Sequence, residues 1–254
     1  MTLLVYDGSM EGFLSAVFHV YEYKISDAQI RPALSSQDNL FGKTIMIEPD
    51  TLKAERVWKG LTTRLSGNGL QQFYRSFLSE VPSVEDHLLQ YCRYVFSSKK
   101  QVESDFTNHS VLLINQLAKQ VYREKHRMEA FVRFQLTADN IYYAVIEPDF
   151  NVLPLLTKHF RDRYADQQWI IYDSQRKYAL YYDLNIVSTV EIDFNEQVSD
   201  ANIKTVSHKD EALYQRLWQQ YFQSVNIEAR KNLKLHIRHM PKRYWRKLIE
   251  KQLK

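Results

Sequence analysis

Cysteine is nearly absent from this sequence, and glycine and proline are scarce. Cys92 is the single cysteine among 254 residues, so the chain cannot form an internal disulfide. One thiol also cannot hold an iron–sulfur cluster, because such clusters need several thiolates. Six glycines and six prolines argue against a loop-rich or repetitive architecture. With 44% hydrophobic and 25% charged residues, the composition is that of a globular protein with one large domain or two modest ones.

Long hydrophobic runs and targeting signals are also missing. No apolar stretch approaches the roughly 20 residues that a membrane-spanning helix needs. The first residues contain no basic region, and Asp7 follows only four apolar residues, which is unlike a signal peptide. We therefore expect a cytoplasmic protein in a reducing compartment, with no membrane partner.

Positive charge is concentrated at the C-terminal end. Arg230–Lys254 holds ten of the 34 lysines and arginines but one of the 30 acids, which leaves 24 cations and 29 acids in residues 1–229. The C-terminal segment therefore carries +9 and the rest −5. Such a separation favours a polyanion partner, DNA above all. A membrane surface, a protein partner, or a solvated helix that offsets an acidic body are the alternatives.

The basic segment also has a pattern of its own. Pro241 suits the first turn of a helix, so we predict a helix at Lys242–Lys251 with about 100° per residue. Its cations then lie on one half, and Tyr244, Trp245, Leu248 and Ile249 lie on the other. This predicts a helix docked through its aromatic side, with a solvent-facing cationic ridge that neutralises phosphates without reading bases. The predicted nucleic-acid-binding residues are Arg230, Lys231, Lys234, Arg238, Lys242, Arg243, Arg246 and Lys247.

The order of the predicted elements favours an α+β fold. Apolar and capping patterns predict strands at 3–6 and 44–47 and helices near 10–23, 51–64, 70–78, 83–96 and 111–124. A twofold pattern then predicts strands at 129–136, 140–146, 168–172, 177–183 and 186–193, with helices near 153–164 and 207–222. Early helices and late strands indicate a helical N-terminal half packed with a mainly antiparallel sheet, rather than alternating β–α–β units.

The same pattern suggests a domain organisation. Residues 1–229 form an α+β body, with a candidate internal boundary in the polar segment near 99–110. Residues 230–254 form the basic, aromatic C-terminal segment.

Charged residues recur at the predicted ends of helices and strands in the second half. Strand alternation would place Glu129 and Arg133 on one face near His126, which suits an ion pair or an anion pocket. Ordinary surface ion pairs are the simpler interpretation of each residue alone. Together they suggest a phosphate or base pocket continuous with the basic segment. The candidate pocket residues are His126, Arg127, Glu129, Arg133, His159, Arg163, Asp173 and Arg176.

Sharper chemical signatures are missing. His236 and His239 are three residues apart, but no nearby cysteine or acid completes a zinc set, so we expect no metal and no cofactor. Asp7, Gly8 and Ser9 place a helix N-terminus after a strand, which can hold a phosphate through backbone N–H groups. The pattern matches neither a Walker loop nor a dinucleotide-binding fingerprint. Catalytic residues are therefore unknown at this stage.

Short segments spread over the chain carry a family resemblance. They are Tyr6–Ser9 with Glu11–Phe13, His126–Met128 with Phe131–Phe134, His159–Phe160 with Arg163, Trp169–Asp173 with Arg176, Asn226–Ile227 with Arg230–Asn232, and Met240–Trp245. Through them the chain resembles, nearly end to end, a bacterial family of unknown function labelled putative DNA metabolism or DNA repair protein. The resemblance implies a genomic neighbour that is a radical S-adenosylmethionine (SAM) DNA modification or repair protein. In some relatives it also implies fusion to a uracil-DNA-glycosylase-like domain.

Two functions of different classes remain open. The first is a DNA-binding accessory protein in repair or modification, non-catalytic alone, that presents DNA to the radical SAM partner. Iron–sulfur chemistry would then belong to that partner, in agreement with the single cysteine. The second is a nucleic-acid-processing enzyme, glycosylase- or nuclease-like, that uses His126, Glu129, His159 or Asp173. Without a recognisable acid–base or metal constellation, the first is favoured.

Overall fold

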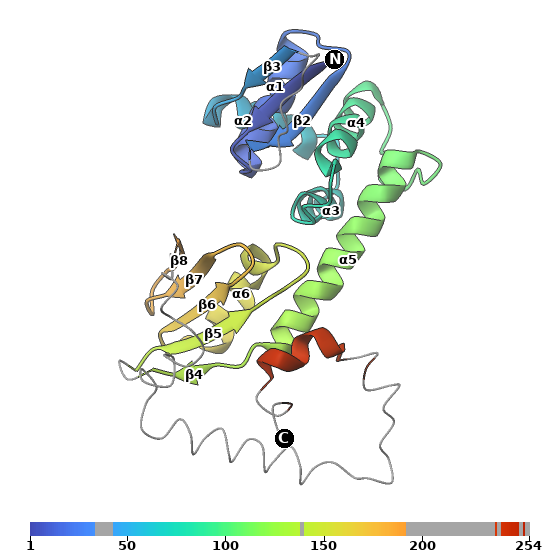
Figure 1. Cartoon of the computed structure of the whole chain (residues 1–254). Helices are drawn as coiled ribbons and strands as arrows, with labels where there is room; N and C mark the ends of the chain where they lie inside the picture. Colours follow the sequence, from blue (N-terminus) through green and yellow to red (C-terminus); the bar gives the residue numbers. More distant parts are fainter. Residues whose placement is uncertain (34–42, 138–139, 192–236, 238–239, 249–250, 252–254) are drawn as a thin grey trace. The chain divides into compact units, whose positions relative to one another are not determined.

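The structure is a computed structural model, and it describes residues 1–33, 43–137, 140–191, 237, 240–248 and 251 (Figure 1). The chain divides into two compact units, Met1–Tyr122 and Arg123–Lys254. The division falls inside one long helix, α5 (His109–Phe131). The polar segment 99–110 lies within the first unit. In the described part of the chain, no helix has the length and apolar character needed to cross a membrane.

The first unit contains a small parallel sheet. Strands β1 (Thr2–Tyr6), β2 (Ala28–Pro32) and β3 (Lys43–Met46) are ordered β2-β1-β3, and both pairings are parallel. Helix α1 (Met10–Glu22) connects β1 to β2, which makes a β–α–β unit that the sequence analysis did not predict. Strand β2 was missed because only its central residue is buried, so its apolar pattern is weak.

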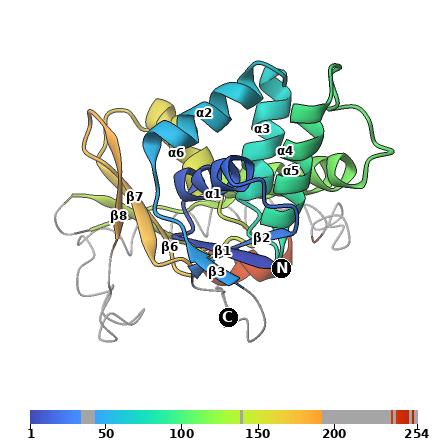
Figure 2. The same ribbon diagram turned by 90° about the horizontal axis from the view of Figure 1, so that it is seen from above.

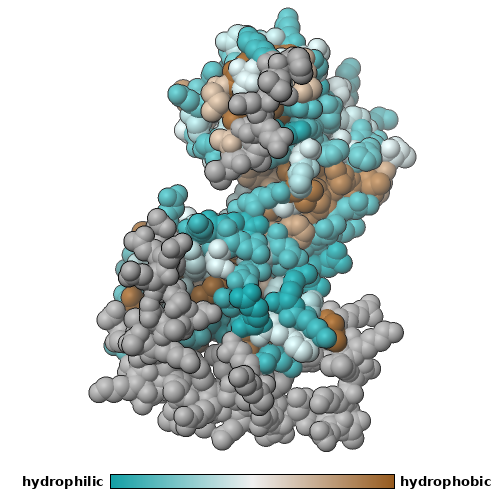
Figure 3. All heavy atoms as spheres, in the orientation of Figure 1, coloured by the Kyte–Doolittle hydropathy of each residue, from teal (hydrophilic) through white to brown (hydrophobic). Residues whose placement is uncertain are grey.

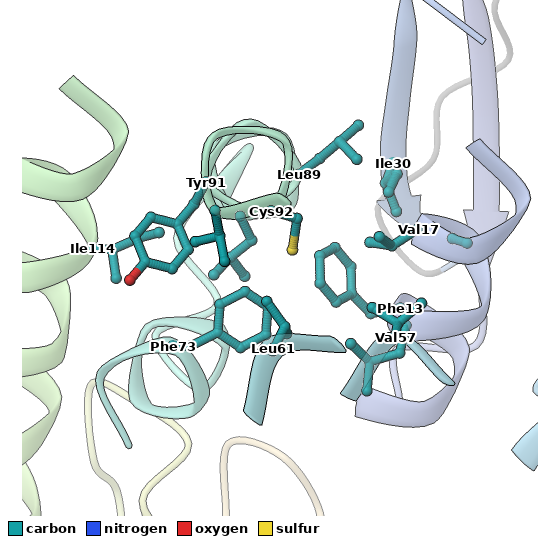
Figure 4. Packing of buried hydrophobic residues seen from close by; sticks show 14 of the residues in the cluster. Phe13, Val17, Ile30, Val57, Leu61, Phe73, Leu89, Tyr91, Cys92 and Ile114 are labelled. Carbon is teal, nitrogen blue, oxygen red and sulfur yellow. The ribbon is translucent and has the colours of Figure 1, made fainter. Parts of the chain in front are cut away.

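Helices build the remainder of the first unit. Helices α2 (Thr51–Thr62), α3 (Gly67–Phe77) and α4 (Val84–Ser97) pack with α1 and the start of α5 around one hydrophobic core. Figure 2 shows α1 and α2 on the same side of the parallel sheet. Figure 4 shows the sulfur of Cys92 pointing toward Phe13 inside this core. Cys92 is fully buried, and burial raises the pKa of its thiol, so it acts as a small hydrophobic side chain.

The second unit contains a mixed sheet. Strands β4 (Gln135–Leu136), β5 (Tyr142–Ile146), β6 (Trp169–Asp173), β7 (Tyr178–Tyr182) and β8 (Val187–Glu191) lie in sequence order. Helix α6 (Leu153–Arg163) connects β5 to β6, which are parallel, while the other three pairings are antiparallel. The α+β class, with helices in the N-terminal half, is confirmed. Each unit nevertheless contains a parallel β–α–β connection, which was not expected.

One predicted strand is wrong in a way that changes the site. Residues 129–136 were expected to be extended, but α5 continues to Phe131 and only Gln135–Leu136 forms a strand. The preceding residues are mostly strong helix formers, and they extend the helix beyond the expected end. Glu129 therefore lies on a helix, and the alternation used to group it with Arg133 does not apply. The helix predicted at 207–222 lies outside the described residues.

Candidate nucleic-acid interface

The described part of the basic segment is a short 3-10 helix. This helix, η3 (Lys242–Lys247), follows Pro241, and Leu248 after it is extended. The expected α-helix at Lys242–Lys251 is therefore replaced, over the described residues, by a tighter turn in which residues three apart share a side. Four of the predicted nucleic-acid-binding residues, Arg230, Lys231, Lys234 and Arg238, lie outside the described part of the chain.

Two buried apolar side chains anchor this segment within the second unit. Tyr244 and Leu248 are buried, with 6% and 1% of their surfaces exposed. The Tyr244 ring centroid lies 5.4 Å from that of Phe131, at the end of α5. The segment is thus docked through one aromatic and one aliphatic side chain.

A buried carboxylate reinforces the docking. Glu124 of α5 is 1% exposed, and its Oε2 accepts hydrogen bonds from the Tyr244 hydroxyl at 2.5 Å and from Arg243 Nη2 at 2.7 Å. Its Oε1 accepts the backbone N–H of Asp149 at 3.1 Å, and Arg127 Nη1 lies 3.6 Å from Oε2. A buried charge requires such partners. Burial, followed by the nearby Glu124 charge and hydrogen bond, raises the pKa of Tyr244, so its hydroxyl stays protonated and donates.

Two of the predicted ridge cations are held by acids of the same unit. Arg243 Nη2 lies 2.8 Å from Asp149 Oδ2, and Lys247 Nζ lies 3.5 Å from Glu147 Oε1. Both acids belong to the loop between β5 and α6. Arg243 and Lys247 thus form ion pairs within the unit, and Lys242, Arg243 and Arg246 are exposed residues. Figure 3 shows hydrophilic residues gathered over η3 and the adjoining end of α5.

The loop that carries these acids is itself fixed by a buried ion pair. Asp173, the last residue of β6, is fully buried, and its Oδ2 accepts from Arg176 Nη1 at 3.0 Å. The same Arg176 nitrogen donates to the Pro148 carbonyl at 3.2 Å. Burial raises the pKa of Asp173, and the Arg176 charge opposes that shift. Asp173 and Arg176 thus support the loop from the carboxyl ends of two parallel strands, a common position for sites in such sheets.

A second cluster joins α5 to α6. Glu129 places Oε2 at 3.6 Å from His126 Nδ1 and Oε1 at 3.5 Å from His159 Nδ1, and Lys125 also pairs with it. The Glu129 side chain is 13% exposed, whereas that of His126 is 78% exposed. One carboxylate therefore lies near two imidazoles, groups able to exchange protons near neutral pH.

The remaining two pocket candidates lie at helix ends. Arg133 Nη1 donates to the carbonyls of Ala130 and Val132 at 2.8 and 3.1 Å, where the last carbonyls of a helix lack partners. Arg163 lies over the Tyr164 ring, with 5.7 Å between the guanidinium carbon and the ring centroid. The eight candidates all belong to the second unit, and the contacts described above place them in several groups.

The residues that organise this region were not predicted from the sequence. Glu124, Glu147, Asp149 and Tyr244 were not proposed as partners of the cations. For Glu124 a signal existed, because Val121 and Met128, three before and four after it, are apolar and buried. That spacing places Glu124 on the buried face of α5. For the loop acids we find no sequence signal.

The phosphate site considered at the first helix is occupied by the chain itself. Asp7 Oδ1 accepts the Ser9 backbone N–H at 2.9 Å and the Ser9 hydroxyl at 2.7 Å. Ser9 Oγ in turn accepts the Gly12 N–H at 2.9 Å. A carboxylate thus already complements this helix N-terminus. Among the described residues, no group of three or more histidine, cysteine or acidic side chains is placed to hold a metal ion, and His236 and His239 fall outside them.

Comparisons with known proteins place the chain in a family but identify no activity. None of the curated proteins matches it. Among solved structures, it is similar to a pGpG-specific phosphodiesterase, PggH, from Vibrio cholerae, with 9% identity, a TM-score of 0.33, and coverage of 89% of this chain and 99% of the other. A likeness this weak supports no inference. The profile of a family described as a domain of unknown function, DUF4130, matches residues 82–250, more than half of the chain. The chain belongs to the DUF4130 family.

Proposed function

We propose that this protein is a DNA-binding accessory protein in DNA repair or modification, non-catalytic alone, that acts with a radical SAM partner. The observation that carries the proposal is the net charge of +9 on the last 25 residues against −5 on the remainder. Charge confined in this way raises the local concentration of a polyanion and binds phosphates through counterion release.

The contacts of the described basic segment support this interpretation. In the part of the segment that the structure describes, Glu124 and Asp149 pair with Arg243, and Glu147 pairs with Lys247. Lys242 and Arg246 are exposed, so phosphates can approach them.

The partner is proposed from the family resemblance. A radical SAM enzyme needs an iron–sulfur cluster, and this chain has only one buried thiol. The partner would supply that chemistry, and this protein would supply the affinity for DNA.

A binding experiment with matched charge reversals tests the proposal. We expect the full chain to bind DNA with little sequence preference, and Lys242→Glu with Arg246→Glu to weaken that binding at least tenfold. Lys59→Glu with Lys119→Glu, at exposed positions of the first unit, changes net charge equally and should have a smaller effect. Equal losses in the two double variants would refute a localised interface.

Salt dependence adds a second measurement. If four to six phosphates are neutralised, the slope of log K against log salt should be roughly −3.5 to −5.5 on duplex DNA. A flat response would contradict the proposal. Co-purification with the radical SAM neighbour, followed by binding assays of each alone and together, tests the partnership.

One observation favours the second candidate function, a nucleic-acid-processing enzyme. Glu129 lies between the Nδ1 atoms of His126 and His159, a composition suited to general acid–base chemistry. Strand cleavage or base release by the purified chain alone, lost in His159→Gln, would support the enzyme and overturn the accessory proposal.

A further inference from the structure

Trp245 stands apart from the other aromatic residue in the described basic segment. Tyr244 is buried and bonded to Glu124, so it is used in docking. Trp245 is only half-buried. Its indole therefore contributes some exposed surface within the most cationic part of the chain.

The indole is held in place and accompanied by ammonium groups. Trp245 Nε1 donates to the Met240 carbonyl at 3.0 Å, which fixes the ring relative to the turn at Pro241. The Lys242 and Lys251 ammonium groups lie 5.9 and 5.1 Å from the centroid of the ring. Both distances are within the roughly 6 Å of a cation–π contact. An aromatic ring and two cations thus form one compact surface group.

This combination has the chemistry of a stacking site for nucleic acid. Proteins that bind single strands without sequence preference combine aromatic rings, on which bases stack, with cations that contact the backbone. In an intact duplex the bases already stack on each other, and a protein ring reaches a base face only after a step is unstacked or a base is flipped out. Phosphate contacts alone, by contrast, need only cations.

We propose that Trp245, with Lys242 and Lys251, stacks an unpaired base, so that this protein prefers single-stranded or locally opened DNA to intact duplex. The inference rests on the proposed function and specifies its substrate. On binding, the ammonium groups of the two lysines leave the ring and contact a phosphate of the DNA. The base attached to that phosphate then stacks on the exposed face of the indole. Tyr244 and Leu248 keep the segment docked while this exchange occurs.

The test compares strandedness and ring chemistry in the full chain. Affinity is measured by fluorescence anisotropy for a single-stranded oligonucleotide and for its blunt duplex, at one salt concentration. Trp245→Ala should weaken single-strand binding by roughly 5- to 150-fold, the range for loss of one base–aromatic stack. Duplex binding should change less than twofold.

Two further variants separate stacking from packing. Trp245→Phe keeps a ring and should retain most of the single-strand affinity, whereas Trp245→Leu keeps an apolar side chain without a π face and should lose it. A single-stranded probe containing 2-aminopurine should be quenched on binding to the wild type and less so by Trp245→Leu. Thermal melts of each variant report whether the fold is retained.

Each outcome decides between the two proposals. Single-strand affinity retained in Trp245→Leu, or equal losses on both DNAs in Trp245→Ala, would overturn the stacking site. A wild type that binds duplex and not single strands would also overturn it, while the DNA-binding proposal would stand. A wild type that binds neither DNA would overturn both.

Discussion

Removal of the Glu124 charge should release the basic segment from the second unit. Glu124 Oε2 accepts from Tyr244 at 2.5 Å and from Arg243 at 2.7 Å, and Oε1 accepts the Asp149 N–H at 3.1 Å. Glu124→Gln keeps one carbonyl acceptor but loses the negative charge and turns an acceptor into a donor. Glu124→Ala removes the acceptor of the buried Tyr244 hydroxyl and of the Asp149 backbone N–H.

The expected magnitudes follow from these partners. A hydrogen bond to a charged group contributes about 1.5–3 kcal/mol, and each unsatisfied buried group costs about 1–3 kcal/mol. The Arg243 side chain is 41% exposed and keeps Asp149, so its share of the pairing is small. We expect Glu124→Gln to lower the free energy of unfolding of the second unit by about 2 kcal/mol, and Glu124→Ala by about 4 kcal/mol. The melting temperature should fall by about 3–5 °C per kcal/mol.

Calorimetry and limited proteolysis measure the two consequences. Trypsin should cut after Lys242, Arg243 and Arg246 sooner in Glu124→Gln than in the wild type, with the cut sites identified by mass spectrometry. Glu129→Gln is the matched control, because Glu129 lies on the same helix and pairs with Lys125, His126 and His159 instead of η3. If Glu124→Gln were no less stable than Glu129→Gln, and no more readily cut at these sites, the docking argument would be refuted.

Three other outcomes are expected. Glu147→Gln with Asp149→Asn releases Lys247 from its ion pair and leaves Arg243 with Glu124 alone, so DNA affinity should rise severalfold and the salt slope should steepen by about one unit. Unchanged values in a titration series would show that these acids do not compete with phosphate. Gly12→Ala places a Cβ against Asp7 Oδ1 and should lower the melting temperature, and adding Asp7→Ala should restore part of the loss. An unchanged melting temperature in the single variant would mean that the Asp7 side chain moves aside. Burial raises the pKa of Glu85, so the ionised carboxylate lowers the stability of the fold above pH about 4.5. Glu85→Gln should therefore melt at a higher temperature than the wild type at pH 7, and the difference should vanish below pH 4.

Local signals in the sequence determined much of the secondary structure. The side chains of Ser9, Asp50 and Ser66 cap α1, α2 and α3 by accepting from backbone N–H groups three residues on. Helices α1 and α2 begin where predicted, and α3 begins three residues earlier, at Gly67. At α4 the helix was predicted to begin at Ser83, but this residue adopts φ 67° and makes no side-chain capping bond. Caps and apolar periods act within a few residues, so they can be recognised without knowledge of the fold. Charge separation and the single thiol likewise follow from composition alone.

Tertiary structure decided the pairings. Strand β1 pairs with β2, and β5 pairs with β6, in parallel, and in each case a helix separates the two strands in the sequence. Strand β2 has a weak apolar pattern of its own and is held in the sheet by its pairing with β1. Glu124 and Tyr244 are 120 residues apart, yet they share one hydrogen bond in a buried site. The sequence contains 30 acids that could have paired with Arg243. The apolar neighbours of Glu124 on α5 place it on a buried face but do not identify its partner, and no pattern in the sequence singles out Asp149. Ion pairs between distant residues are selected by where the backbone brings charges together, and burial then makes the selected pair costly to break.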